Sequence, residues 1–335
     1  MNVFLNDEEM EKVDESKYLG TIVSNNGERV AERKKRIKDT NSVANEVVQI
    51  CKETELSRIR LRYVKLLINA CLDSKVKYGC ALWNIRKNKS ATDDLDKIKP
   101  KLIKRVMEMP FSTPSVAIQY EFGINNLSLD VLMEKIILAV ETLNRSDDRI
   151  SKRLLKPMLE KNVPGFCAEL KEACSLFEVD LLELLEINDI RSHMKEKVIV
   201  IQSKYLLENM LVSSKMDRVL LGGFKYNGKI MKYLVELNFD EAKAVFMTRY
   251  RMLPTKTNFP GRWKGTSCDV CGFEDTDGHV FSCPGYKDID TKDISLEMFW
   301  DDQILNNTER ISEVARKMVK IIERMQEIKD LQLTA

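Results

Sequence analysis

Histidine is almost absent from this chain, since only two of its 335 residues, His193 and His279, are of that type. The sequence also has no glycine-rich phosphate loop, no Gly-x-Ser-x-Gly turn and no His-Glu-x-x-His pair. The chain therefore lacks the common motifs of P-loop nucleotide hydrolases, serine hydrolases and zinc proteases. No apolar run reaches about 18 residues, the length needed to span a membrane. No basic start followed by an apolar run is present, so we expect no signal peptide.

Glycine and proline are scarce, with 13 and 8 residues, while Lys, Glu, Leu and Ile abound. Hydrophobic residues make up 44% of the chain and charged residues 32%, which is typical of a globular protein. This composition predicts a mainly α-helical fold. The formal net charge is +2, too small for a strongly basic overall field. Any contact with nucleic acid must therefore come from local basic patches.

Five of the eight cysteines lie within apolar helical patterns, which favours buried thiols over a disulfide framework. We therefore expect an intracellular protein of the nucleus or cytoplasm that is not secreted. These five residues are Cys51, Cys71, Cys80, Cys167 and Cys174.

Changes of periodicity divide the chain into four segments. Residues 1–27 are predicted to form a short antiparallel strand unit, and residues 28–110 and 111–237 two helical segments. Residues 238–335 combine a helix, a Cys/His cluster and a terminal helix. Within the second segment, Pro100 is expected to interrupt a helix. The terminal helix is predicted to bury one apolar face, formed by Ile311, Val314, Met318, Ile321, Ile322 and Met325.

The cluster CDVCGFEDTDGHVFSC, residues 268–283, has the spacing of a metal site. Two cysteines separated by two residues can share an ion on one tight turn, and the histidine and last cysteine lie about one helical turn apart. Four ligands with no vacancy predict one structural Zn²⁺. The alternatives are a chance clustering of buried cysteines and a thioredoxin-like redox pair, which the additional His and Cys disfavour. The predicted ligands are Cys268, Cys271, His279 and Cys283.

Basic residues crowd three stretches between positions 33 and 105. Such stretches can neutralise phosphates, although a solvated helix face balanced by carboxylates is the alternative. The first two stretches supply the predicted nucleic-acid-binding residues, which are Arg33, Lys34, Lys35, Arg36, Lys38, Arg58, Arg60, Arg62 and Lys65.

The stretch FWDD, residues 299–302, imitates the Phe-x-Asp-Asp turn of polymerase palms. A palm turn needs apolar strands on both sides, whereas a helical pattern follows here. Asp301 and Asp302 are therefore predicted to be carboxylates at a helix start, near its positive dipole end.

Four stretches in order, ESKYLGTIVSNNG, VKYGCALWN, MPFSTPSVAIQYEFGI and NFPGRWKGTSCDVCGFEDTDGHVFSC, carry a family resemblance. Together they resemble the C-terminal part of non-LTR (LINE-type) retrotransposon reverse transcriptases, over nearly the whole chain. The resemblance implies the end of a palm over 1–27, a thumb over 28–110, a connector over 111–237 and a CCHC zinc knuckle within 238–335. The family usually has four residues between the knuckle's histidine and last cysteine, whereas three separate His279 from Cys283.

The palm aspartates of that family would precede residue 1, so we expect no polymerase activity from this chain. The resemblance implies a fragment of an RNA-directed DNA polymerase that binds RNA or DNA through backbone contacts. The alternative is a zinc-stabilised helical scaffold without nucleic-acid binding, which would recruit a protein partner through the helix over residues 304–331. No membrane partner is expected.

Overall fold

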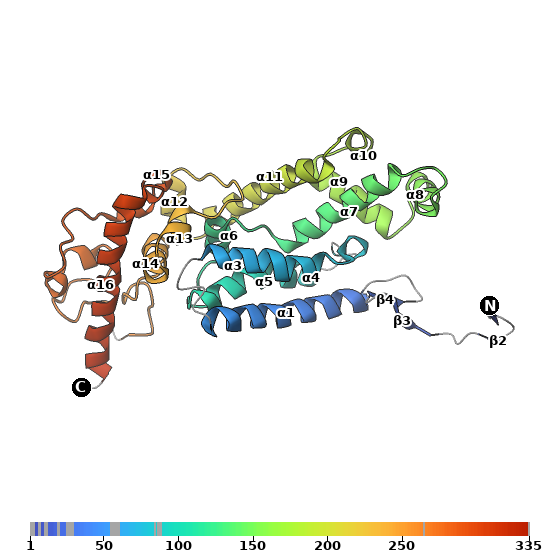
Figure 1. Cartoon of the computed structure of the whole chain (residues 1–335). Coiled ribbons are helices and arrows are strands. Elements are labelled where there is room, and N and C mark those ends of the chain that lie inside the picture. The colour runs from blue at the N-terminus through green and yellow to red at the C-terminus, as the bar shows by residue number, and fades with distance from the viewer. Residues whose placement is uncertain are drawn as a thin grey trace. The chain divides into compact units, whose positions relative to one another are not determined.

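The computed structural model is mainly helical and opens with short antiparallel strands, which confirms the predicted fold class (Figure 1). The residues that the structure describes are 4–5, 8–9, 13–18, 21–24, 30–53, 61–83, 85, 89–263 and 265–333.

The strands form two pairs, β1 with β2 and β3 with β4, each antiparallel. Leu5 lies opposite Glu8 in the first pair, and Tyr18 lies opposite Thr21 in the second. The strand bounds are β1 Phe4–Leu5, β2 Glu8–Glu9, β3 Glu15–Tyr18 and β4 Thr21–Ser24.

Helices follow over most of the remaining described chain. Up to residue 143 they are α1 Val30–Glu53, α3 Arg62–Leu67, the π-helix Ile68–Asp73, α4 Ser74–Lys77, the 3-10 helix Cys80–Leu82, α5 Lys89–Val106, α6 Ser115–Phe122 and α7 Leu127–Leu143. Next come α8 Ile150–Glu160, α9 Phe166–Phe177, α10 Leu181–Leu184, α11 Ile190–Leu211, α12 Asp217–Leu221, α13 Lys232–Glu236 and α14 Phe239–Arg249. The last are three 3-10 helices, His279–Phe281, Pro284–Tyr286 and Leu296–Phe299, followed by α15 Asp302–Leu305 and α16 Thr308–Leu333.

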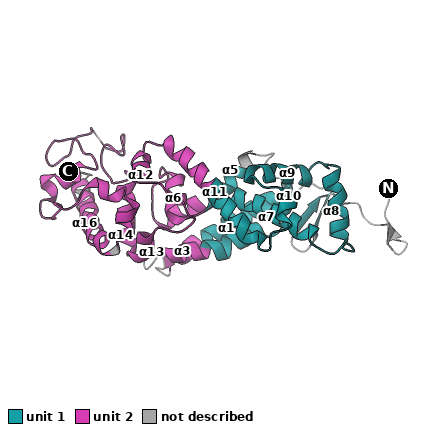
Figure 2. Cartoon of the chain, turned by 90° about the horizontal axis from the view of Figure 1, so that it is seen from above, with its two compact units in different colours: residues 1–46, 68–98, 125–201 teal, residues 47–67, 99–124, 202–335 magenta. Residues whose placement is uncertain are grey.

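The chain divides into two compact units (Figure 2). Unit 1 comprises residues 1–46, 68–98 and 125–201, and unit 2 comprises residues 47–67, 99–124 and 202–335. The four predicted segments, with borders after residues 27, 110 and 237, stay predictions.

Unit 1 is built around α7, whose side chains are buried on nearly every side. The 3-10 helix Cys80–Leu82, α8 and α9 pack against it. Lys135 of α7 forms a fully buried ion pair with Glu169, and its Nζ also donates to the carbonyl oxygen of Trp83 at 2.8 Å. Trp83 itself is completely buried.

Unit 2 is built around the packing of α14 against α16, supported by α13, α15 and the 3-10 helix Leu296–Phe299. The predicted apolar face of α16 is confirmed, since its residues are buried except for the half-buried Ile322. Within the described residues, no helix is long and apolar enough to cross a membrane.

The predicted interruption at Pro100 is wrong, because α5 continues through this residue. A proline inside a helix removes one backbone hydrogen bond and strains the preceding turn. Pro100 is buried, as are Leu102 and Ile103 that follow it on the helix. Burial of this apolar stretch offsets the lost hydrogen bond.

Candidate functional site

The structure brings the four predicted metal ligands together in one cluster, with their ligand atoms all within 4.8 Å of one another. The Sγ atom of Cys283 lies 3.7 Å from that of Cys268 and 3.8 Å from that of Cys271. The Nε2 atom of His279 lies 3.2 Å from the Sγ atom of Cys271. Thiolates and an imidazole are ligands of soft and borderline metal ions, so the cluster can hold one such ion.

A tight backbone turn positions the first two candidate ligands, Cys268 and Cys271. The Gly272 amide donates to the Cys268 carbonyl oxygen at 2.9 Å, and the Cys268 amide donates to the Phe273 carbonyl oxygen at 2.6 Å. Gly272 has a φ angle of +78°, in the left-handed region that suits glycine. The sequence therefore folds this loop so that Cys268 and Cys271 present their thiols to the same side.

A single helical turn positions the other two candidate ligands, His279 and Cys283. His279 begins a 3-10 helix, and the Cys283 amide donates to the His279 carbonyl oxygen at 3.0 Å. The His279 amide donates to the Oγ1 atom of Thr276 at 3.2 Å. The three-residue spacing between His279 and Cys283 is therefore sufficient to place both side chains in the cluster.

Burial disfavours the ionised form of one thiol in the cluster. Cys268 and Cys283 are buried, whereas Cys271 and His279 are half-buried. Burial, reinforced by the neighbouring cysteine sulfurs, raises the pKa of the Cys283 thiol to about 12. A bound cation would favour the thiolate form of Cys283.

Three aspartates, of which Asp275 and Asp277 are buried, fix the loop that leads from α14 to the cluster. The backbone amide of Lys256 donates to the Asp275 side chain at 2.8 Å, and the Nζ atom of Lys256 forms an ion pair with Asp269 at 2.5 Å. The side-chain nitrogen of Asn258 donates to Asp277 at 2.6 Å. Sequence reasoning missed these supporting residues, although two of them stand between the cysteine pair and His279.

The predicted basic residues of α1 divide into buried arginines and accessible lysines. Arg33 and Arg36 are buried, and the Nε atom of Arg36 donates to Glu32 at 2.5 Å. Lys34 and Lys38 are exposed and Lys35 is half-buried. These three lysines form no ion pair or hydrogen bond with any residue that the structure describes. The lysines, and not the arginines, are therefore available to a ligand.

The second predicted basic stretch is only partly within the described residues. Arg58 and Arg60 lie outside them. Arg62 is exposed and its guanidinium lies 5.0 Å from the ring centroid of Tyr63. The Nζ atom of Lys65 donates to the carbonyl oxygens of Gly123 and Gly228 at 2.9 and 3.1 Å, so this side chain has a structural role.

The carboxylates of FWDD begin a helix, as predicted. Asp301 is the N-cap of α15, and its side chain accepts from the Gln303 amide at 2.7 Å. Asp302 accepts from Arg249 and from the Tyr120 hydroxyl, each at 2.5 Å. Both carboxylates are therefore held in structural bonds.

Sequence reasoning missed the buried polar network to which Asp302 belongs. Arg249 also pairs with Glu121 at 2.8 Å, and both side chains are fully buried. The Tyr250 hydroxyl also donates to the Glu121 carboxylate. Burial raises the pKa of Glu121, while Arg249 acts in the opposite direction. No spacing rule joins these residues, because they come from distant parts of the chain.

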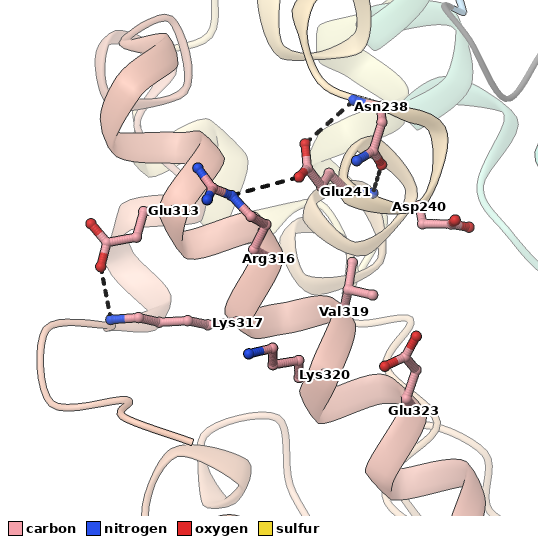
Figure 3. A pocket seen from close by; sticks show the side chains of 9 residues that line it. All are labelled: Asn238, Asp240, Glu241, Glu313, Arg316, Lys317, Val319, Lys320 and Glu323. Atoms are coloured by element: carbon pink, nitrogen blue, oxygen red, sulfur yellow. Dashed lines mark hydrogen bonds and ion pairs between the residues drawn. The ribbon is translucent and has the colours of Figure 1, made fainter. Parts of the chain in front are cut away.

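A groove between the start of α14 and α16 is lined by side chains of both charges (Figure 3). Arg316 pairs with Glu241 at 3.8 Å, and Lys317 with Glu313 at 3.1 Å. Asn238 and Glu241 satisfy the first amides of α14 through a capping box. This groove therefore offers no excess of positive charge.

Comparison of the chain with protein-family models, with curated proteins and with solved structures finds no match.

Proposed function

We propose that this chain is a nucleic-acid-binding protein with a structural zinc module, related to the C-terminal region of non-LTR reverse transcriptases. The observation that carries the proposal is the set of unpaired lysines on α1, Lys34, Lys35 and Lys38. Three accessible lysines on one helix that form no ion pair with a described residue attract a polyanion even though the whole chain is almost neutral.

Zinc is the proposed ion because the sulfur geometry matches a tetrahedral site. A Zn–S bond of about 2.3 Å gives a tetrahedral edge of roughly 3.8 Å between two sulfurs. The distances of 3.7 and 3.8 Å from Cys283 to the other two thiols agree with this edge. Four protein ligands leave no coordination position for substrate, so the ion's proposed role is to hold the module in shape.

Among the aromatic residues near the turn that carries Cys268 and Cys271, Phe273 is the most available to an unpaired base. Its side chain is 72% exposed, which is unusual for phenylalanine. Trp263 is half-buried under Lys329, whose Nζ lies 4.5 Å from the ring centroid, and Phe281 is half-buried. A base stacked on Phe273 would add a contact that does not depend on sequence.

The scaffold alternative is less well supported. It assigns partner binding to the terminal helix, but residues such as Ile311, Met318 and Ile321 on the apolar face of α16 are already buried within unit 2. A partner helix would have to displace these intramolecular contacts.

The test is a binding titration with RNA and DNA, single-stranded and duplex, across a salt series. The triple variant Lys34→Ala, Lys35→Ala, Lys38→Ala should lose about 1 kcal/mol or more of binding free energy for every sequence, with a shallower salt dependence. The matched control replaces Lys161, Lys171 and Lys195, three exposed lysines of unit 1, by alanine. A flat salt response of the parent, or equal losses in both variants, would refute the proposal.

A further inference from the structure

A second concave surface, within unit 1, is strongly positive. It occupies about 460 Å³ and is lined by Lys17, Lys35, Arg36, Asp39, Ser74, Lys75 and Tyr78, which come from β3, from α1 and from the turn around α4. We call it the lysine pocket. Four of these residues are cationic, and among the described residues that line it Asp39 is the single carboxylate.

The arginine of the lysine pocket is neutralised and fixed, whereas the lysines are not. Arg36 pairs with the buried Glu32, and its guanidinium lies 4.7 Å from the ring centroid of Tyr78. Glu32 also accepts from the Ile22 amide at 2.7 Å, which ties β4 to α1. Over the described chain, neither Lys17, Lys35 nor Lys75 has an ion pair or hydrogen bond.

Three unpaired lysines around one pocket repel one another, and an anion between them removes this repulsion. Ser74 also lines the pocket, but its hydroxyl donates to the carbonyl oxygens of Ala70 and Cys71 at 2.6 and 3.2 Å, so the lysine ammonium groups are the donors suited to an oxyanion. Ser74 follows directly on the π-helix Ile68–Asp73, a rare element that is frequent at functional sites.

We propose that the lysine pocket binds a phosphate group of a nucleic-acid strand. Phosphate supplies a compensating negative charge, and its oxygens accept hydrogen bonds from the lysine ammonium groups. The identity of the strand rests on the proposed function, whereas the phosphate chemistry rests on the pocket alone. Lys17 and Lys75 thereby become ligand-binding residues, in addition to the lysines of α1.

The experiment uses the full chain with the double substitution Lys17→Gln and Lys75→Gln, which removes two charges outside the set tested above. The matched control is Lys161→Gln with Lys195→Gln. Fluorescence anisotropy with labelled single-stranded RNA should show an affinity about fivefold weaker or more for the pocket variant. Its slope of log K against log salt should be smaller by about 1, because one phosphate contact is lost. Lys17→Arg with Lys75→Arg should restore binding, and circular dichroism should show all variants folded.

A second arm replaces the strand by inorganic phosphate or a nucleoside triphosphate at matched ionic strength. If the parent binds no strand but binds the triphosphate, and the pocket variant does not, the lysine pocket is a phosphate site for a free nucleotide and the proposed function fails. If the pocket variant behaves like its control in every arm, the pocket proposal is refuted even though the parent binds nucleic acid.

Discussion

Arg249 is a residue whose single replacement should be costly. Its guanidinium is fully buried and pairs with the equally buried Glu121 and with Asp302. Arg249→Met would leave a carboxylate in the core without its cation, so we expect the free energy of unfolding to fall by about 3–5 kcal/mol.

Urea denaturation measures this loss, and Arg316→Met is the matched control. The side chain of Arg316 is 66% exposed and its ion pair with Glu241 spans 3.8 Å, so its replacement should cost less than about 1 kcal/mol. Similar losses in the two variants would show that the buried network contributes little.

Asp96 should make stability depend on pH. Burial raises the pKa of its carboxyl from an ordinary 3.8 to about 6, although the Ser128 amide and hydroxyl donate to it and lower the pKa in part. Because the folded protein then holds this proton more tightly than the unfolded chain, the contribution to stability is complete below about 3.9 and is lost as the pH rises through 6.

Asp96→Asn imitates the protonated carboxyl and should remove this dependence. The variant should match the parent near pH 4 and exceed its unfolding free energy by up to about 3 kcal/mol at pH 7. Urea titrations at several pH values test this, with Asp93→Asn, at an exposed position, as the control. An offset between Asp96→Asn and parent that stays constant with pH would contradict the assignment.

At the scale of elements, the loop with the Cys/His cluster, residues 268–283, and the helix α16 are stabilised by different forces. The α16 helix is held by its buried apolar face. The loop carrying the four candidate ligands contains little regular structure beyond short 3-10 helices, so we expect metal binding to supply much of its folding free energy.

Cys271→Ser should therefore reduce the zinc content from one equivalent toward zero, as measured by metal analysis of the purified protein. Amide hydrogen exchange should become faster in residues 266–286 and stay unchanged in α7 of unit 1. Cys174→Ser, which alters a cysteine outside the cluster, is the control. Retention of a full equivalent of zinc by Cys271→Ser would refute the site.

At the scale of the whole molecule, we expect binding without synthesis. Asp301 and Asp302 are held as a helix cap and as an ion-pair partner of Arg249, so they are not free to hold the metal ions of phosphoryl transfer. This chain should extend no primer on an RNA or DNA template with magnesium or manganese. Extension that disappears in Asp301→Asn or Asp302→Asn would show that these carboxylates are catalytic.

Features that depend on neighbours along the chain can be predicted from the order of residues alone. Composition predicted a mainly helical fold, and the period of apolar residues predicted the buried face of α16. The spacing of the cysteines and His279 predicted the Cys/His cluster, because a tight turn and one helical turn suffice to bring the four side chains together. The N-cap role of Asp301 is local for the same reason.

Which charged side chains are buried, and which form ion pairs, depends on how the helices pack against one another. Arg33 and Lys34 are adjacent and equally basic in sequence, yet the first is buried and the second exposed, since a helix turns successive side chains to different faces. The lysine pocket and the pair of Arg249 with Glu121 join residues from separate elements. Their formation depends on how the helices pack, which local propensity and spacing do not specify.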